Sequence, residues 1–108
     1  MNTGEREREN TESLVNVGLY YDVKEGMEKD FEKMFSGVID YLKANAEGFI
    51  EAKLYKDTSS SEYLILSLWK TRESFRDFME SRAFHETTTS GKNLLKGQPF
   101  HRIFIPGE

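Results

Sequence analysis

The stretch EYLILSLWKTRESF, residues 62–75, decides the fold that this sequence predicts. Residues Glu62–Trp69 form the most hydrophobic of the predicted strands, and a short apolar run of this kind is typical of a central strand. Thr71 follows where a helix N-cap belongs, and Glu73 places a negative charge in the first turn, where it complements the helix dipole. We therefore predict a strand that leads directly into a helix over Arg72–Ser81.

Three further elements are predicted before this strand. Residues Leu14–Val23 alternate between two faces at a period of two, which indicates a strand with apolar groups on both sides. Residues Met27–Asn45 carry apolar side chains at steps of three and four, which indicates an amphipathic helix. Residues Phe49–Lys56 alternate again, and the polar run Asp57–Ser61 predicts the turn of a hairpin that joins them to the next strand.

The C-terminal part of the chain contains one more predicted strand. Ala83 and Phe84 continue the apolar surface through a short irregular turn, and the Thr-rich run His85–Gly91 is polar, so no regular element is predicted there. One helical turn is predicted over Lys92–Lys96. A Gly-Gln-Pro sequence stops it, and Phe100–Ile105 form the last strand.

The resulting order is β-α-β-β-α-β, which is the split βαβ pattern of a ferredoxin-like α+β fold. It predicts a four-stranded antiparallel sheet with both helices on one face. The other face then has no cover within the chain, and we expect it to carry aromatic residues such as Tyr20, Phe49, Tyr55 and Tyr63. A homodimer that packs sheet on sheet is the simplest cover, because one self-complementary patch then serves two molecules.

Composition limits the functions that this chain can have. The 108 residues include 19 Asp and Glu, 15 Lys and Arg, and no Cys. We expect a disordered tail over residues 1–12 and a single domain over residues 13–108. The mild acidity argues against nucleic acid, no apolar run is long enough for a membrane span, and disulfides and thiolate metal sites are excluded. We expect a soluble, cytoplasmic protein.

Three segments together resemble a known family. They are Gly26 with the amphipathic helix that contains Phe31, the segment Leu66–Phe75, and the segment Phe78–Phe84. Over Val15–Phe104 the chain resembles the antibiotic biosynthesis monooxygenase-like (ABM) domain of the dimeric α/β-barrel group. The resemblance implies a homodimer with a pocket between the sheet and the helices of each subunit. Members include cofactor-independent oxygenases that act on polycyclic phenols, and haem-degrading monooxygenases.

The residues of the haem-degrading members are not present at the matching positions. Where those members carry Asn, Trp and a haem-ligating His, this chain has Leu19, Phe78 and Thr88. The nearest residues of the same types are displaced along the sequence, and they are Asn16, Trp69 and His85. The resemblance therefore implies the fold and an oxygenase-like pocket, without the haem-degrading site.

Two residues are candidates for catalysis. His85 could act as a general base or an iron ligand, since neutral imidazole suits both roles, and otherwise it is a surface residue after a helix. Asn16 could donate a hydrogen bond to a substrate oxygen or to O₂, although Val15 and Val17 are expected to face the core. His101 is expected on a strand face or at a dimer interface. No spacing of these residues predicts a metal site.

The expected pocket is apolar and suits a small apolar or aromatic ligand. Four tyrosines, at 20, 21, 55 and 63, supply phenols that could orient such a ligand. The residues predicted to line the pocket are Leu19, Phe31, Phe35, Trp69, Phe75, Phe78 and Thr88.

Three functional classes fit this sequence. The first is a small monooxygenase without a cofactor. The second is a binding module that holds an apolar ligand or haem without turnover, or a haem-degrading enzyme with altered ligands. The third is an interaction protein in which only the dimer matters, because a ferredoxin-like fold does not determine a function.

Overall fold

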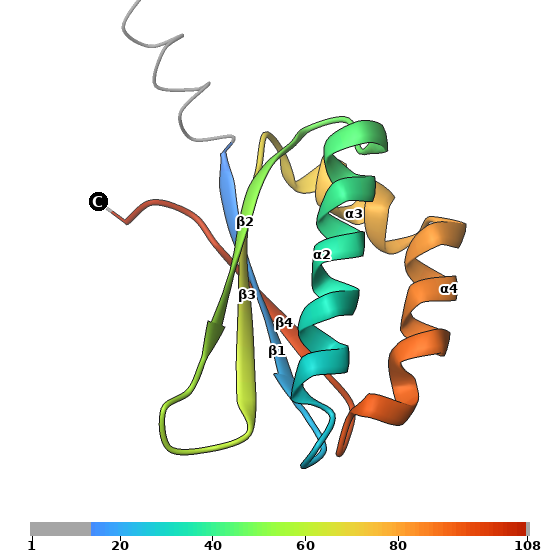
Figure 1. The fold of residues 1–108 in the computed structure, drawn as a ribbon. Coiled ribbons are helices and arrows are strands. Elements are labelled where there is room, and N and C mark those ends of the chain that lie inside the picture. Colours follow the sequence, from blue (N-terminus) through green and yellow to red (C-terminus); the bar gives the residue numbers. More distant parts are fainter. Residues whose placement is uncertain (1–13, 108) are drawn as a thin grey trace, which may run out of the picture.

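Four strands form one antiparallel sheet in the order β2-β3-β1-β4 (Figure 1). They are β1 (Val15–Asp22), β2 (Phe49–Lys56), β3 (Glu62–Trp69) and β4 (Phe100–Phe104). The computed structural model describes residues 14–107. The predicted tail over residues 1–12 lies outside the described residues.

The helices lie on one face of this sheet (Figure 1). Helix α2 (Glu28–Asn45) follows β1, and α3 (Arg72–Met79) follows β3. Helix α4 (Arg82–Gly91) and the 3₁₀ turn η1 (Lys92–Leu94) lead to β4. The predicted ferredoxin-like fold is confirmed, with one more helix in the order β-α-β-β-α-α-β.

Helix α4 differs from the sequence-based prediction, which gave most of this segment no regular structure. Ser81 caps the helix, because its Oγ accepts a hydrogen bond from the backbone N–H of Phe84 at 3.1 Å. Three consecutive threonines have low intrinsic helix propensity, and for this reason the sequence did not predict a helix here. Its apolar and small residues nevertheless recur at helical spacing on the side that faces the sheet, and they are Phe84, Thr87, Thr88 and Gly91.

Gly91 allows α4 to approach α2. A Cβ atom at this position would lie 2.7 Å from Cε of Met34, so any larger residue would have to displace the methionine. The end of α4 therefore packs directly on α2 and helps to enclose the space above the sheet.

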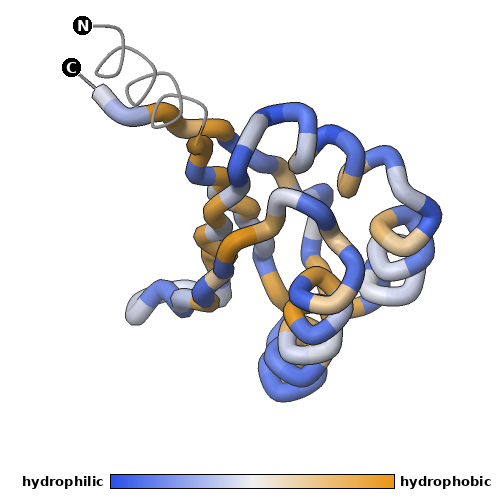
Figure 2. Tube along the Cα trace, turned by 90° about the horizontal axis from the view of Figure 1, so that it is seen from above, coloured by the Kyte–Doolittle hydropathy of each residue, from blue (hydrophilic) through white to orange (hydrophobic). Residues whose placement is uncertain are grey.

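The core lies between the sheet and the helices, and Figure 2 shows the apolar stretches concentrated along the strands. Trp69 is 1% exposed at the end of β3. Its indole packs against Phe49, Phe75 and Phe78, with ring centroids 5.3, 5.5 and 5.6 Å away. A second buried cluster consists of Val23, Phe31 and Tyr63.

The face of the sheet opposite the helices carries exposed aromatic side chains. Tyr20 on β1 stacks on Phe100 on β4, with ring centroids 4.8 Å apart. The guanidinium of Arg102 lies 5.7 Å from the centroid of the Phe100 ring. Tyr55 and Phe104 are 47% and 43% exposed. We call this surface the open face.

Two of the aromatic residues expected on the open face lie on the helix side instead. A bulge between Phe49 and Glu51 interrupts the alternation of β2, and Phe49 packs edge-on against Trp69. Tyr63 lies opposite Tyr21 in the register of β1 and β3, and it is buried against Phe31. The expectation was wrong for Phe49 because of the bulge in β2, and for Tyr63 because this residue shares a face with Trp69 along the uninterrupted strand β3.

Candidate functional site

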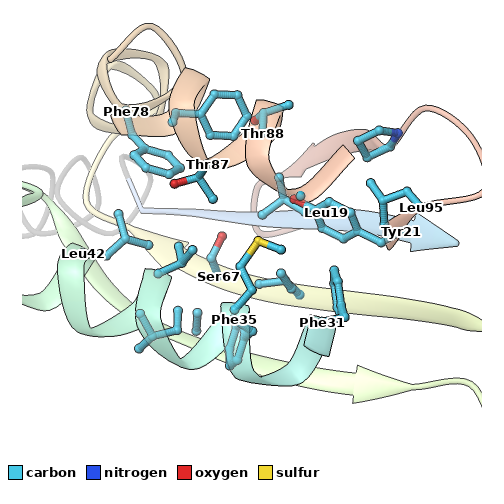
Figure 3. Close-up of a pocket in the computed structure, with 18 of the residues that line it drawn as sticks. Leu19, Tyr21, Phe31, Phe35, Leu42, Ser67, Phe78, Thr87, Thr88 and Leu95 are labelled. Carbon is cyan, nitrogen blue, oxygen red and sulfur yellow. The ribbon is translucent and has the colours of Figure 1, made fainter. Parts of the chain in front are cut away.

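A cavity of about 120 Å³ lies between the sheet and helices α2 and α4 (Figure 3). The sheet contributes its floor, α2 one wall and α4 the other. The lining residues are Leu19, Tyr21, Ala52, Ile65, Ser67 and Trp69 from the sheet, Phe31, Met34, Phe35, Val38, Ile39 and Leu42 from α2, Phe78 from α3, Phe84, Thr87, Thr88 and Gly91 from α4, and Leu95 and Pro99 from the segment before β4.

The lining contains no carboxylate, ammonium, guanidinium or imidazole group. Its polar side-chain groups are the indole N–H of Trp69 and four hydroxyls, those of Tyr21, Ser67, Thr87 and Thr88. Thr88 and Pro99 are the lining residues that are also exposed at the surface, so the cavity opens beside them. The site is therefore an uncharged apolar chamber with a few hydroxyl groups.

The hydroxyl of Ser67 is used inside the protein. It accepts a hydrogen bond of 3.0 Å from Nε1 of Trp69 and donates one of 3.0 Å to the backbone carbonyl of Val17. These two bonds fix the buried indole at one end of the cavity floor. Ser67 therefore positions Trp69, and its donor is not free for a ligand.

The hydroxyl of Tyr21 is free for a ligand. Its ring packs at an angle on Phe31, with centroids 5.2 Å apart, and Figure 3 shows its oxygen turned into the cavity next to Leu19. Burial raises the pKa of Tyr21 to about 12, and no hydrogen bond or charge contributes to this shift. At neutral pH the side chain is therefore a neutral O–H donor without a protein acceptor among the described residues.

Six of the seven residues expected in the pocket lie in the cavity lining, and they are Leu19, Phe31, Phe35, Trp69, Phe78 and Thr88. The seventh, Phe75, lies outside it. Its ring packs between Trp69 and His101, with centroids 5.5 and 5.4 Å away. Phe75 therefore supports the floor of the cavity through the indole.

The structure places Asn16 on the open face. It lies opposite Leu68 of β3 and Phe104 of β4, and the alternation of β1 turns it away from Leu19 and the cavity. A hydrogen bond from Asn16 to a ligand in the cavity would have to cross the sheet.

The structure places His85 on α4, exposed and outside the lining. Its neighbour Phe84 faces the cavity, and the two ring centroids are 6.1 Å apart. Because Phe84, Thr87 and Thr88 occupy the inner side of the helix, His85 lies on its outer side. His101 is also exposed, on β4 at the edge of the sheet.

Tyr21 and Thr87 are site residues that sequence reasoning did not single out. Tyr21 shares a face with Leu19 at a period of two, so the alternation of β1 could have placed it in the pocket. The sequence analysis named four tyrosines that could orient a ligand and did not choose among them. Thr87 became recognisable only once α4 was known to be helical.

Within residues 14–107, no group of three His, Asp or Glu side chains gathers closely enough to hold a metal ion. Among these residues no helix is long and apolar enough to cross a membrane.

The fold is shared with solved structures of low sequence identity. One is a "putative antibiotic biosynthesis monooxygenase" from Caulobacter crescentus, with a TM-score of 0.80, 18% identity, and coverage of 96% of this chain and 99% of that one. Another is SnoaB, a cofactor-independent oxygenase from Streptomyces nogalater, with a TM-score of 0.76 and 18% identity. That match covers 89% of this chain and 95% of SnoaB.

A relative from Natronomonas pharaonis named "Putative heme-binding protein" is 32% identical over 90 residues. The match covers 82% of this chain but only 15% of that much longer protein. Residues 14–89 match the family described as Antibiotic biosynthesis monooxygenase. Since this match takes in well over half of the sequence, the chain belongs to the antibiotic biosynthesis monooxygenase family.

Proposed function

We propose that this chain is a small monooxygenase that holds an apolar or aromatic substrate in the cavity between the sheet and the helices. The observation that carries the proposal is an apolar cavity into which one unpartnered phenol hydroxyl points. The family and the shared fold with a cofactor-independent oxygenase support the same reading.

A reaction without a cofactor draws its electrons from the substrate. For a phenol, a ring C–H becomes the second carbonyl of a quinone with one atom of O₂, and the other atom leaves as water. The substrate enters as the neutral phenol, the apolar walls exclude water from the reacting ring, and Tyr21 donates a hydrogen bond to the substrate oxygen, where negative charge develops.

The proton that the substrate loses has no acceptor in the lining. His85, the base suggested by the sequence, lies on the outer side of α4. The substrates that fit are therefore those that ionise or change tautomer readily without a strong base. In this proposal His85 can accept the substrate proton only after that proton has left the cavity.

The test is oxygen uptake with a panel of one-ring phenols, with naphthols as the two-ring comparison. Thr88→Trp fills the mouth of the cavity, whereas Thr89→Trp adds the same bulk to α4 at a position outside the lining. We expect a substrate-dependent uptake that Thr88→Trp lowers at least about tenfold and Thr89→Trp retains. Equal uptake in both variants, or none in the wild type with any substrate, would contradict the proposal.

Haem is the alternative ligand, and the name of the Natronomonas relative favours it. The cavity does not fit it. A volume of about 120 Å³ is close to that of an engineered cavity that accepts a single benzene ring (about 150 Å³), whereas haem has four pyrrole rings. No imidazole lines the cavity, and Thr88 stands where the family resemblance would place the ligating His.

We further infer that a second copy of this chain covers the open face. The stacked pair Tyr20 and Phe100, with Arg102 over it, offers a flat patch that can pack on its own copy around a two-fold axis. Tyr55 and Phe104 extend this patch towards both edges of the sheet. In that dimer Asn16 lies at the interface and has a structural role.

A further inference from the structure

The cavity discriminates by charge. None of its nineteen lining residues is charged at neutral pH, and its four hydroxyls cannot supply a counter-ion. An anion or cation that entered would lose its hydration without a partner of opposite charge, which costs far more than the burial of a neutral polar group. The cavity is therefore suited to neutral molecules.

The cavity also offers a small set of hydrogen bonds. Ser67 is engaged with Trp69 and Val17, so it does not contribute a donor. Tyr21 supplies the remaining hydroxyl on the sheet side, and Thr87 and Thr88 lie opposite it on α4 (Figure 3). The neutral phenol O–H of Tyr21 points into the cavity and needs an acceptor there, and a carbonyl oxygen is a good neutral acceptor.

The size of the cavity limits the ligand to about one ring. The volume of about 120 Å³ holds a benzene-sized body, and small substituents can extend to the mouth beside Thr88 and Pro99. A fused two-ring ligand would have to move α4 or displace Met34 from its contact with Gly91.

We propose that the cavity selects neutral one-ring molecules that carry a carbonyl oxygen, and that the Tyr21 hydroxyl is the residue that recognises this oxygen. The inference rests on the proposed function in that the same cavity holds the substrate, and it names the chemical class that this cavity accepts. A quinone formed from a one-ring phenol belongs to this class.

The test compares three probes of nearly equal shape in calorimetric titrations. Acetophenone carries the carbonyl, α-methylstyrene replaces the C=O by C=CH₂, and benzoate replaces the methyl group by a charged oxygen. We expect acetophenone to bind about fivefold more tightly than α-methylstyrene, which is the worth of one net hydrogen bond. We expect no heat of binding from benzoate at neutral pH.

Two neighbouring tyrosines provide the matched variants. Tyr21→Phe removes only the hydroxyl that points into the cavity, and Tyr20→Phe removes one on the open face. We expect the preference for acetophenone over α-methylstyrene to vanish in Tyr21→Phe and to persist in Tyr20→Phe. Binding of α-methylstyrene should be unchanged in both variants, which shows that the cavity is intact.

Three results would overturn the inference: a preference that survives in Tyr21→Phe, benzoate that binds as tightly as acetophenone, or acetophenone that does not bind.

The bulkier 2-acetylnaphthalene tests the size limit, and binding as tight as that of acetophenone would contradict this limit. These measurements contain no oxygen chemistry. If the probes behave as expected and no substrate consumes O₂, the oxygenase proposal fails and the ligand class stands.

Discussion

The hydroxyl of Tyr63 on β3 donates a part-buried hydrogen bond of 2.7 Å to Oε2 of Glu32 on α2. This bond links the central strand to the helix that forms one wall of the cavity. Tyr63→Phe keeps the ring contacts with Phe31 and removes only this bond. We expect it to lower the free energy of unfolding by about 1 kcal/mol, or the melting temperature by about 5 °C. Thermal unfolding followed by circular dichroism measures this.

The control for that variant is Tyr41→Phe. Tyr41 is 44% exposed on α2 and lies outside the open face, so its hydroxyl should not contribute to stability. Equal melting temperatures for the two variants would show that the bond to Glu32 does not stabilise the fold.

The free energy of unfolding should fall at high pH, because two tyrosines have a higher pKa in the folded state than in the unfolded state. Burial raises the pKa of Tyr21 to about 12, and burial with the nearby Glu32 raises that of Tyr63 to about 12. Both folded values lie above the ordinary 10, so the folded state keeps its protons longer than the unfolded state. Their contribution to stability is complete below pH 10 and is lost as the pH rises towards 12.

Denaturant unfolding at pH 8, 10 and 11 tests this expectation, with Tyr21→Phe/Tyr63→Phe as the reference, because lysines titrate in both proteins alike. The wild type should lose more stability than the double variant between pH 10 and 11. The near-ultraviolet absorbance of phenolate gives a second readout, since two of the five tyrosines should ionise late. Parallel pH profiles for the two proteins would refute the expectation.

Ser67→Ala should destabilise the cavity floor. The substitution leaves the buried Nε1–H of Trp69 without its acceptor, and a buried unsatisfied donor costs about 1–3 kcal/mol. Denaturant unfolding followed by tryptophan fluorescence measures the loss. Ser36→Ala is the control, because Ser36 bonds only to the exposed backbone of its own helix. A loss no larger than that of Ser36→Ala would mean that Trp69 is held by packing alone.

The open face should hold the protein as a dimer. We expect light scattering to give about twice the chain mass of 12.6 kDa for the wild type. Phe100→Asp places a charge in the stacked pair with Tyr20 and should shift the protein to the monomer. Tyr41→Asp changes a comparably exposed aromatic on α2 and should leave the dimer intact. A dimer that survives Phe100→Asp and dissociates in Tyr41→Asp would place the interface on the helices.

Hemin should not bind in the cavity. A titration followed by absorption should show no saturable shift of the Soret band, because the lining offers no imidazole and the volume is too small. Thr88→Trp and His85→Ala should match the wild type. A saturable shift lost in Thr88→Trp would show that α4 opens to admit haem, and one lost only in His85→Ala would identify His85 as an outer-surface ligand.

Much of the fold was predictable because it depends on local patterns. The alternation of β1, the amphipathic stripe of α2 and the Thr71 cap of α3 each act within a few residues, and the structure has all three. The bulge after Phe49 accompanies a contact with Trp69, which lies twenty residues further along the chain, and no local pattern of the sequence indicates such a contact.

The candidate site was harder to predict than the fold. Apolar lining residues such as Leu19 and Phe31 follow from periodicity, because the cavity is simply an unfilled part of the core. The catalytic candidates Asn16 and His85 were chosen by residue type, and type does not say which side of a strand or helix a residue occupies. Tyr21 is placed by the register of β1 against β3, which is a property of the whole sheet.

Strand β1 separates the cavity from the open face, with Leu19 and Tyr21 on one side and Tyr20 on the other. Odd-numbered side chains of β1 therefore face the helices, and even-numbered side chains face the opposite side of the sheet. A mutant library that randomises Leu19 and Tyr21 would reshape the chamber, and one that randomises Asn16 and Tyr20 would reshape the outer surface. An engineer who wants a new ligand preference can work on one set and leave the other as it is.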